Sequence, residues 1–206
     1  MEEQSPLEKF YKGEDDTPYY AALGRFVTYY AAAEAAVHML ARKLSGLSDQ
    51  KARVMISGLR LGDVQSKVKA LMKISSPGTA TQTTIEQCLT QLDVIATNRD
   101  KLVHRIVSVK GETLNVTNIF TAKSLLTHEE ESFTIHDINC MQGDCMIIYA
   151  RLERVRLPSL KKGDSAEFAR SIASPWFYKP QRPETRGKQR DQSSRSRRTP
   201  HQSSAE

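Results

Sequence analysis

The segment Asn98–His104 contains residue types that can cleave a phosphodiester bond without a metal ion. A histidine can take the proton from a ribose 2′-hydroxyl, and an arginine can stabilise the charge that develops on the phosphate. Asp100 lies four residues before His104, so on a helix both side chains share one face and the carboxylate can orient the imidazole. This chemistry would act on RNA and not on DNA, because it needs the 2′-hydroxyl as its nucleophile.

Arg99 and His104 are five residues apart, so on a helix their side chains point about 140° away from each other at roughly 100° per residue. Either the length of the arginine side chain or a second subunit must bring both groups to one phosphate. The spacing alone is not specific, because Arg195 and His201 show a similar one. The structural alternative is a helix end where His104 interacts with the helix dipole and Asp100 makes an ordinary surface contact.

The helices that must position these residues are predicted by the spacing of the apolar side chains. Steps of three and four residues predict helices over 18–44, 48–74, from 83 or 84 to 104, 134–156 and, shorter, 165–173. Residues 106–118 alternate like a β-hairpin with its turn at 110–112, and residues 121–131 are ambiguous. The sequence therefore predicts an all-α fold, a four- to five-helix bundle with a small β-hairpin insertion and a disordered basic C-terminal tail.

The composition divides the chain into three parts. A polar N-terminal lead covers residues 1–16, the helical domain covers 17–178, and the basic tail covers 179–206. The chain has a formal net charge of +6, and the tail contains eight basic and three acidic residues, so the body is almost neutral. The tail is too polar to fold alone. Its Arg195, Arg197 and Arg198 are candidates for binding RNA through phosphates, and the alternative is a solvated chain end.

Composition also argues against several classes of protein. No stretch approaches the roughly 18 uninterrupted apolar residues of a membrane helix. Residues 1–12 lack the layout of a signal peptide. Three cysteines, an odd number, do not form the framework of a secreted disulfide-rich protein. We therefore expect a cytoplasmic protein with reduced thiols that does not contact a membrane.

The run Arg99–His104 closes an amphipathic helix and follows a long helix that carries Glu34. In this context it resembles the HEPN superfamily (higher eukaryotes and prokaryotes nucleotide-binding). The hallmark of that family is an Arg, then four to six residues, then a His, often with Asn, Asp or His directly after the Arg. Arg99, Asp100 and His104 match that pattern, and the resemblance covers residues 17–157.

The resemblance implies a metal-independent endoribonuclease without a cofactor, whose site forms where the motifs of a homodimer meet. It further implies a role as a toxin or in RNA defence, with an antitoxin or another protein as partner. We expect His104 to act as general base or acid, Arg99 to stabilise phosphate charge and Asp100 to orient His104. Two alternatives stay open. The first is an interaction or nucleotide-binding module that does not cut, as some family members are, and the second is nucleic-acid binding by the tail alone.

Glu34 is a candidate supporting residue. It interrupts a run of alanines on or beside the apolar stripe of its predicted helix. A buried carboxylate needs a partner, and Arg99 is the one we predict. The alternative is that Glu34 lies at the edge of the stripe, in water, where its carboxylate needs no partner.

Two weaker patterns each have a structural alternative. His136 and Cys140 are four residues apart and could form half of a metal site, although zinc usually has four ligands at recognisable spacing. Core cysteines and a surface histidine explain the same pattern. The pairs Tyr19–Tyr20 and Tyr29–Tyr30 could stack on bases or could belong to the core.

Overall fold

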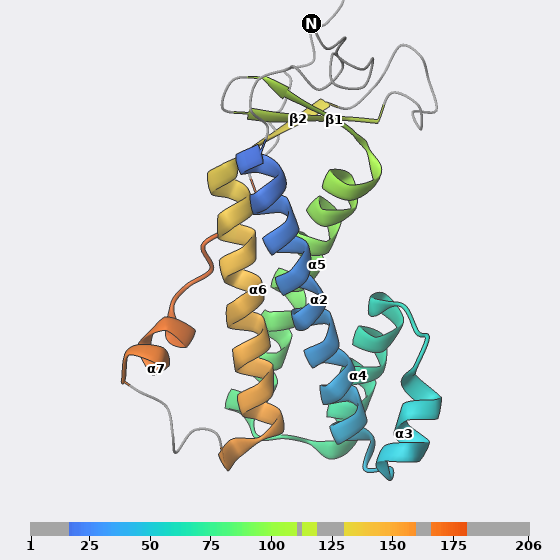
Figure 1. Cartoon of the computed structure of the whole chain (residues 1–206). Coiled ribbons are helices and arrows are strands. Elements are labelled where there is room, and N and C mark those ends of the chain that lie inside the picture. Colours follow the sequence, from blue (N-terminus) through green and yellow to red (C-terminus); the bar gives the residue numbers. More distant parts are fainter. Residues whose placement is uncertain (1–16, 111–112, 119–129, 160–165, 181–206) are drawn as a thin grey trace, which may run out of the picture.

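Two long helices form the centre of the computed structural model, α2 (Thr17–Ser45) and α6 (Ile135–Arg156) (Figure 1). The structure describes residues 17–110, 113–118, 130–159 and 166–180. The predicted lead, 1–16, lies outside these residues, as does the tail from 181 onward.

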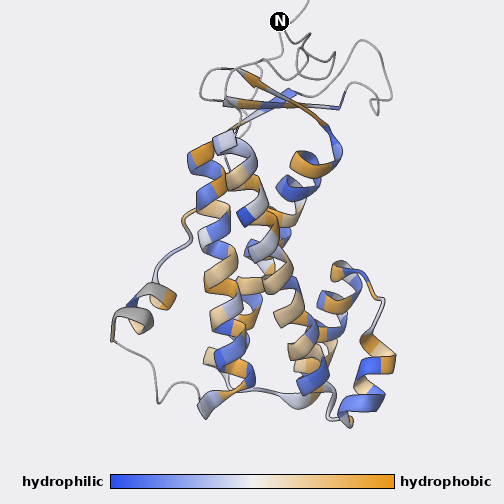
Figure 2. Cartoon of the chain, in the orientation of Figure 1, coloured by the Kyte–Doolittle hydropathy of each residue, from blue (hydrophilic) through white to orange (hydrophobic). Residues whose placement is uncertain are grey.

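The other helices pack around this central pair. α5 (Thr79–His104) packs against α6, and α3 (Asp49–Ile56) and α4 (Leu61–Ser75) pack against α2. The short helix α7 (Ala166–Ala173) lies beside α6 (Figure 1). Each long helix carries both hydrophobic and hydrophilic residues (Figure 2). Their buried side chains recur at helical spacing, as Phe26, Tyr30, Val37 and Leu40 do in α2.

The hairpin prediction is confirmed, and a third strand joins it. β1 (Ile106–Lys110), β2 (Thr113–Thr117) and β3 (Glu130–Thr134) form an antiparallel sheet in that order. In its register Val107 pairs with Val116, and Leu114 pairs with Phe133. The sheet lies at one end of the bundle, where Leu114, Val116 and Phe133 extend the core. The pattern of residues 121–131 did not predict β3, and 119–129 lie outside the described residues.

One helix prediction is wrong. The expected single helix over 48–74 is two helices, α3 and α4, because the chain turns at residues 57–60. Gly58 has a φ of +78° there, a left-handed conformation that residues with a Cβ rarely adopt. The remaining helices match their predicted positions within a few residues at each end. α6 begins where Thr134 and Asp137 form a capping box, each side chain accepting a hydrogen bond from the backbone of the other residue.

Residues 174–178, which we call the C-terminal strap, run in a non-helical conformation across α5 and α6. The Asp144 side chain, with none of its residue surface exposed, accepts hydrogen bonds from the backbone N–H groups of Phe177 (2.8 Å) and Tyr178 (3.0 Å). Gln91 Nε2 donates to Asp144 at 2.8 Å and to the Tyr178 carbonyl at 3.1 Å. Burial raises the pKa of the Asp144 carboxyl, and these hydrogen bonds oppose the shift. The strap is therefore an integral part of the fold.

The observed architecture confirms the predicted all-α bundle with a small β element. None of the helices in the described part of the chain is long and apolar enough to cross a membrane.

Candidate functional site

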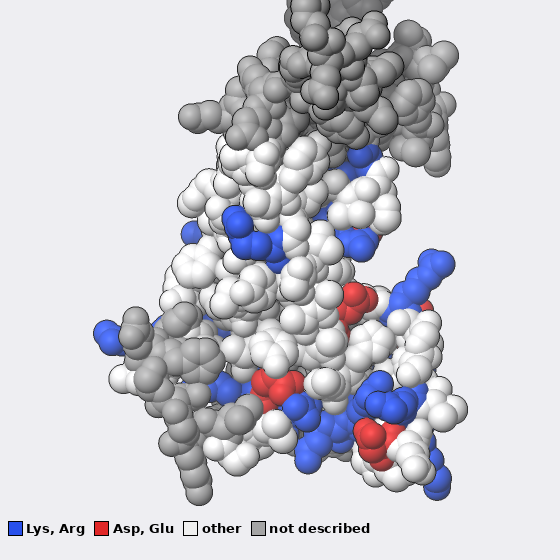
Figure 3. All heavy atoms as spheres, viewed as in Figure 1, with Lys and Arg blue, Asp and Glu red and all other residues white. Residues whose placement is uncertain are grey.

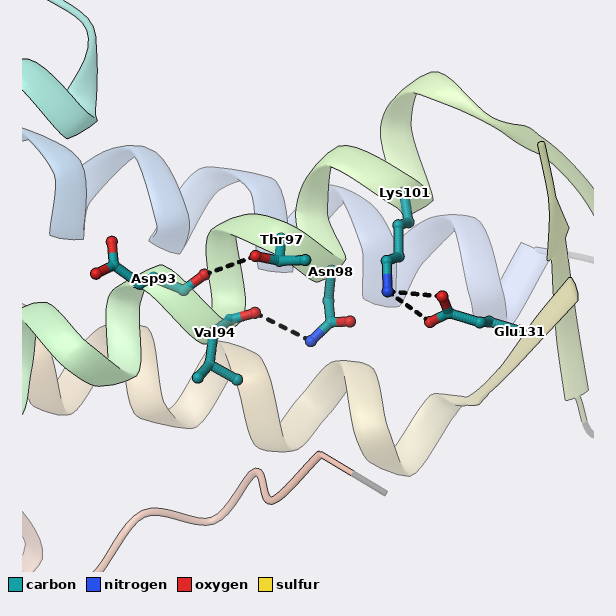
Figure 4. Close-up of polar contacts among 6 residues, drawn as sticks. All are labelled: Asp93, Val94, Thr97, Asn98, Lys101 and Glu131. Atoms are coloured by element: carbon teal, nitrogen blue, oxygen red, sulfur yellow. Dashed lines mark hydrogen bonds and ion pairs between the residues drawn. The ribbon is translucent and has the colours of Figure 1, made fainter. Parts of the chain in front are cut away.

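Arg99, Asp100 and His104 lie in the last turns of α5, directly before the sheet. One residue, Arg105, separates His104 from β1, and its extended backbone ends the helix. The Lys101 ammonium group donates to the Glu131 carboxylate at 2.7 Å, which ties this end of α5 to β3 (Figure 4). Helix and sheet thus hold the candidate site together from two sides.

The Arg99 guanidinium joins the other two side chains. Its Nη1 donates to Asp100 Oδ1 at 2.9 Å and to His104 Nε2 at 3.2 Å. The reach of the arginine side chain therefore overcomes the angular separation on the helix within a single subunit. The described contacts include no hydrogen bond between Asp100 and His104, because the carboxylate faces the guanidinium instead. Asp100 is thus placed to orient Arg99 rather than the imidazole.

The contact between Arg99 and His104 places a hydrogen-bond donor against a ring nitrogen. A guanidinium has only donors, so His104 Nε2 serves as the acceptor in the neutral tautomer that carries its proton on Nδ1. In that tautomer the same Nε2 lone pair is the one that can take a proton from a substrate.

Tyr30 of α2 lies beneath the guanidinium. Arg99 Cζ is 5.6 Å from the centroid of the Tyr30 ring, within the range of a cation–π interaction. The ring is 7% exposed and packs edge-on against Phe26, with centroids 6.3 Å apart. Burial and the charge of Glu34 raise the pKa of the Tyr30 hydroxyl, while Arg99 opposes the shift. Tyr30 therefore stays un-ionised and serves as a platform for Arg99.

Glu34 does not form the predicted ion pair with Arg99 among the described contacts. It is partly exposed, one helical turn from Tyr30, and acts on that hydroxyl through its charge. The Arg99 side chain extends over Tyr30 towards His104 and so leaves Glu34 at the border of the site. The expected pairing is therefore corrected to an indirect contact through Tyr30.

Comparisons with protein-family models, curated proteins and solved structures found no match to this chain. The case for a function therefore depends on the chemistry and geometry of its own residues.

His136 and Cys140, the predicted half of a metal site, lie next to each other on α6. Cys140 Sγ lies 3.4 Å from His136 Nε2, and the described residues contain no group of three or more His, Cys, Asp or Glu that could hold a metal ion. Burial raises the pKa of Cys140, and it raises those of Cys88 and Cys145 to about 12. These thiols carry almost no thiolate, the form that binds metals or attacks electrophiles, at neutral pH.

The tyrosine pairs are divided between core and surface. Tyr19 and Tyr30 are buried, whereas Tyr20 is exposed and Tyr29 is partly exposed. The core interpretation is thus confirmed for one member of each pair.

The proposed RNA-binding residues Arg195, Arg197 and Arg198 lie outside the described residues. On the face shown in Figure 3, uncharged atoms cover the middle of the bundle over α2 and α6, with Lys and Arg scattered around them. Among the described residues, this face therefore shows no continuous basic groove of the kind that tracks a nucleic-acid backbone.

Proposed function

We propose that the protein is a metal-independent endoribonuclease of the HEPN type, with His104 and Arg99 as catalytic residues. One observation carries the proposal, the 3.2 Å approach of the Arg99 guanidinium to the His104 imidazole at the surface of the bundle. Transfer of a phosphoryl group to a 2′-hydroxyl requires two groups, a proton acceptor and a cation that binds the phosphate. In the proposed site these two groups are in direct contact.

The contact suggests how substrate activates the base. A phosphate oxygen is a better acceptor for the guanidinium than a neutral imidazole, because it is charged. As Arg99 turns to the phosphate, His104 Nε2 becomes free and takes the proton of the 2′-hydroxyl. The 2′-oxygen then forms a bond to phosphorus, the bond from phosphorus to the 5′-oxygen breaks, and the leaving oxygen takes a proton from water.

The ion pair of Arg99 with Asp100 does not explain this arrangement by stability. Asp100 has 66% of its side chain exposed and Arg99 has 28%, so their ion pair is largely screened by water and contributes little. Arg99 Nε is buried without a hydrogen-bond partner, which costs free energy. Charged groups that are held in place without a clear gain in stability are typical of functional sites.

The first test is cleavage of labelled RNA by the purified full-length protein in the presence of a chelator. We expect cleavage with EDTA, and products that end in a 2′,3′-cyclic phosphate and a 5′-hydroxyl, because the 2′-oxygen is the nucleophile. A matched substrate with 2′-deoxyribose throughout should stay intact. A requirement for added divalent ions, or cleavage of the all-deoxy strand, would contradict the mechanism.

The Tyr30 platform gives a second test with a matched pair of variants. Tyr30→Phe keeps the ring beneath Arg99 and should cleave RNA like the wild type. Tyr30→Leu keeps an apolar side chain but removes a cation–π contact of about 1 kcal/mol, so kcat should fall roughly fivefold as the guanidinium loses its position.

Circular dichroism and thermal unfolding provide the control for the Tyr30 pair, since both variants retain the helical fold if the effect is local. Equal kcat in the two folded variants would show that the aromatic ring does not position Arg99.

A further inference from the structure

The short helix α3 exposes large apolar side chains to solvent. Its Ala52 and Ile56 are buried, and α3 packs against α2. Val54 lies two residues from each of them, which places it on the opposite side of the helix. It is 82% exposed, and its neighbour Met55 is 63% exposed. Side chains of this kind lose free energy in water, so two of them together on one short helix indicate a contact with something apolar.

Basic side chains lie beside these apolar residues. Lys51 is three residues before Val54 and four before Met55, so the three side chains share one face of α3. Arg60 follows in the turn that leads into α4, and both cations are exposed. The outer face of α3 therefore combines aliphatic and cationic groups within one or two helical turns.

The net positive charge of the described chain comes from the region around α3. Residues 42–75 contain eight Lys or Arg and two Asp or Glu, whereas the other described residues contain ten of each kind. The two carboxylates, Asp49 and Asp63, lie in the first turns of α3 and α4, where they interact favourably with the helix dipoles. Figure 3 shows Lys and Arg gathered at this end of the bundle, over α3, α4 and the end of α2.

The cations of this region are not compensated within the fold. Among the described residues, no ion pair or hydrogen bond is formed by the exposed side chains of Lys51, Arg60, Lys67, Lys69 and Lys73. Elsewhere in the bundle, by contrast, Lys101 pairs with a carboxylate of β3. An uncompensated basic surface attracts a partner that carries many negative charges.

The composition of the surface favours a lipid membrane over other polyanions. Residues 42–75 contain no Phe, Tyr or Trp, so this region has no aromatic ring on which the bases of a nucleic acid could stack. On a phosphate backbone Val54 and Met55 would also stay in water, whereas a membrane takes up aliphatic side chains below its headgroups. A second copy of this chain is disfavoured, because its positive charge at the same region repels.

From the exposed Val54 and Met55 and the uncompensated cations around them, we infer that α3 docks the protein on the surface of an anionic membrane. The two aliphatic side chains enter the boundary between headgroups and acyl chains, and Lys51 and Arg60 contact lipid phosphates. Such a contact needs no helix that spans the bilayer. The inference therefore replaces the expectation that the protein does not contact a membrane, which depended on the absence of a long apolar stretch. It is independent of the nuclease proposal, since it depends on none of the same residues.

Co-sedimentation of the purified full-length protein with lipid vesicles tests the inference. Vesicles of phosphatidylcholine and phosphatidylserine in a ratio of about two to one should bind the protein at least tenfold more tightly than vesicles of phosphatidylcholine alone, because only the anionic surface attracts the cations. Equal binding to both kinds of vesicle, or no binding to the anionic ones, would overturn the inference.

Two double variants separate this surface from the basic tail, which both of them retain. Val54→Ser with Met55→Ser removes the apolar groups and keeps every charge, and it should weaken binding to the anionic vesicles at least tenfold. Met146→Ser with Tyr149→Ser removes two exposed apolar side chains of α6 and should leave binding unchanged. Binding of the Val54 and Met55 variant as tight as that of the wild type would overturn the inference.

A third double variant distinguishes the membrane from a nucleic acid. Lys51→Gln with Arg60→Gln should weaken binding to the anionic vesicles at least tenfold, because each cation near the surface contributes to the attraction. It should weaken binding to a duplex of 2′-O-methyl RNA, which has no free 2′-hydroxyl and is not cleaved, by at most twofold. A larger loss for the RNA than for the vesicles would assign the surface to nucleic acid and overturn the inference. Circular dichroism checks that each variant keeps the helical fold.

Discussion

His104→Ala should reduce RNA cleavage by a factor of about 10²–10⁴, the usual contribution of a general base. Arg99→Ala should reduce it by about 10²–10³, because Arg99 is the cation in contact with His104 that stabilises the charge that develops on phosphorus. Both losses should appear mainly in kcat, since each group acts on the transition state. The measurement is kcat and KM from the initial rates of cleavage of a labelled RNA in the presence of EDTA, over a range of RNA concentrations.

Two surface substitutions provide matched controls. His136→Ala removes an exposed histidine whose described contact is with Cys140, and Arg53→Ala removes an exposed arginine of α3. Both should cleave RNA at the wild-type rate. Thermal unfolding should show that His104→Ala and Arg99→Ala keep the fold, because His104 is exposed and the ion pair of Arg99 with Asp100 is largely solvated. A double variant of Arg99 and His104 that remains as active as the wild type would rule out the nuclease proposal.

Asp144→Ala should lower the free energy of unfolding by about 3 kcal/mol. The substitution leaves the part-buried backbone N–H of Phe177 and the buried backbone N–H of Tyr178 without their acceptor. An unsatisfied buried donor costs roughly 1–3 kcal/mol, and Gln91 keeps the Tyr178 carbonyl as a second partner. For a chain of this size the loss corresponds to a fall in Tm of roughly 10 °C. Thermal and urea unfolding followed by circular dichroism measure it.

The control for Asp144→Ala is Asp93→Ala, which removes a carboxylate from the exposed face of α5. It should change the Tm by no more than a degree or two, because a solvated carboxylate contributes little. Trp176 fluorescence should also change in Asp144→Ala, since release of the strap removes the indole from Arg151. An Asp144→Ala variant as stable as Asp93→Ala would show that the strap is not held by this carboxylate.

The helices could be predicted because their information is local. The apolar spacing of α6, with Thr134 before it, and the β-branched alternation of β1 and β2 each lie within a short stretch of sequence. The separation of α3 from α4 also has a local cause, the turn at Gly58. The sequence alone could not show this turn, because a glycine can also lie within a continuous helix. β3 has few apolar residues, and its pairing with β2 is a tertiary contact.

The candidate site was predictable only where its residues share one helix. Arg99, Asp100 and His104 come from the same turns of α5, so their proximity follows from sequence spacing. Tyr30 lies on another helix, and its position beneath Arg99 depends on how α2 and α5 are arranged in space. Asp144 and Gln91 are likewise polar residues on apolar faces, and the strap that explains them is distant in the sequence. No periodicity can reveal such partners.

The short connection between α5 and β1 does not tolerate an inserted or deleted residue. Only Arg105 separates the imidazole of His104 from a strand in which Val107 and Val109 face the core. Because the faces of a strand alternate, one inserted amino acid at this joint would turn both valines outward and Ser108 inward. An insertion at residues 111–112, between paired strands, would leave both intact. Natural length variation should therefore be confined to the hairpin tip.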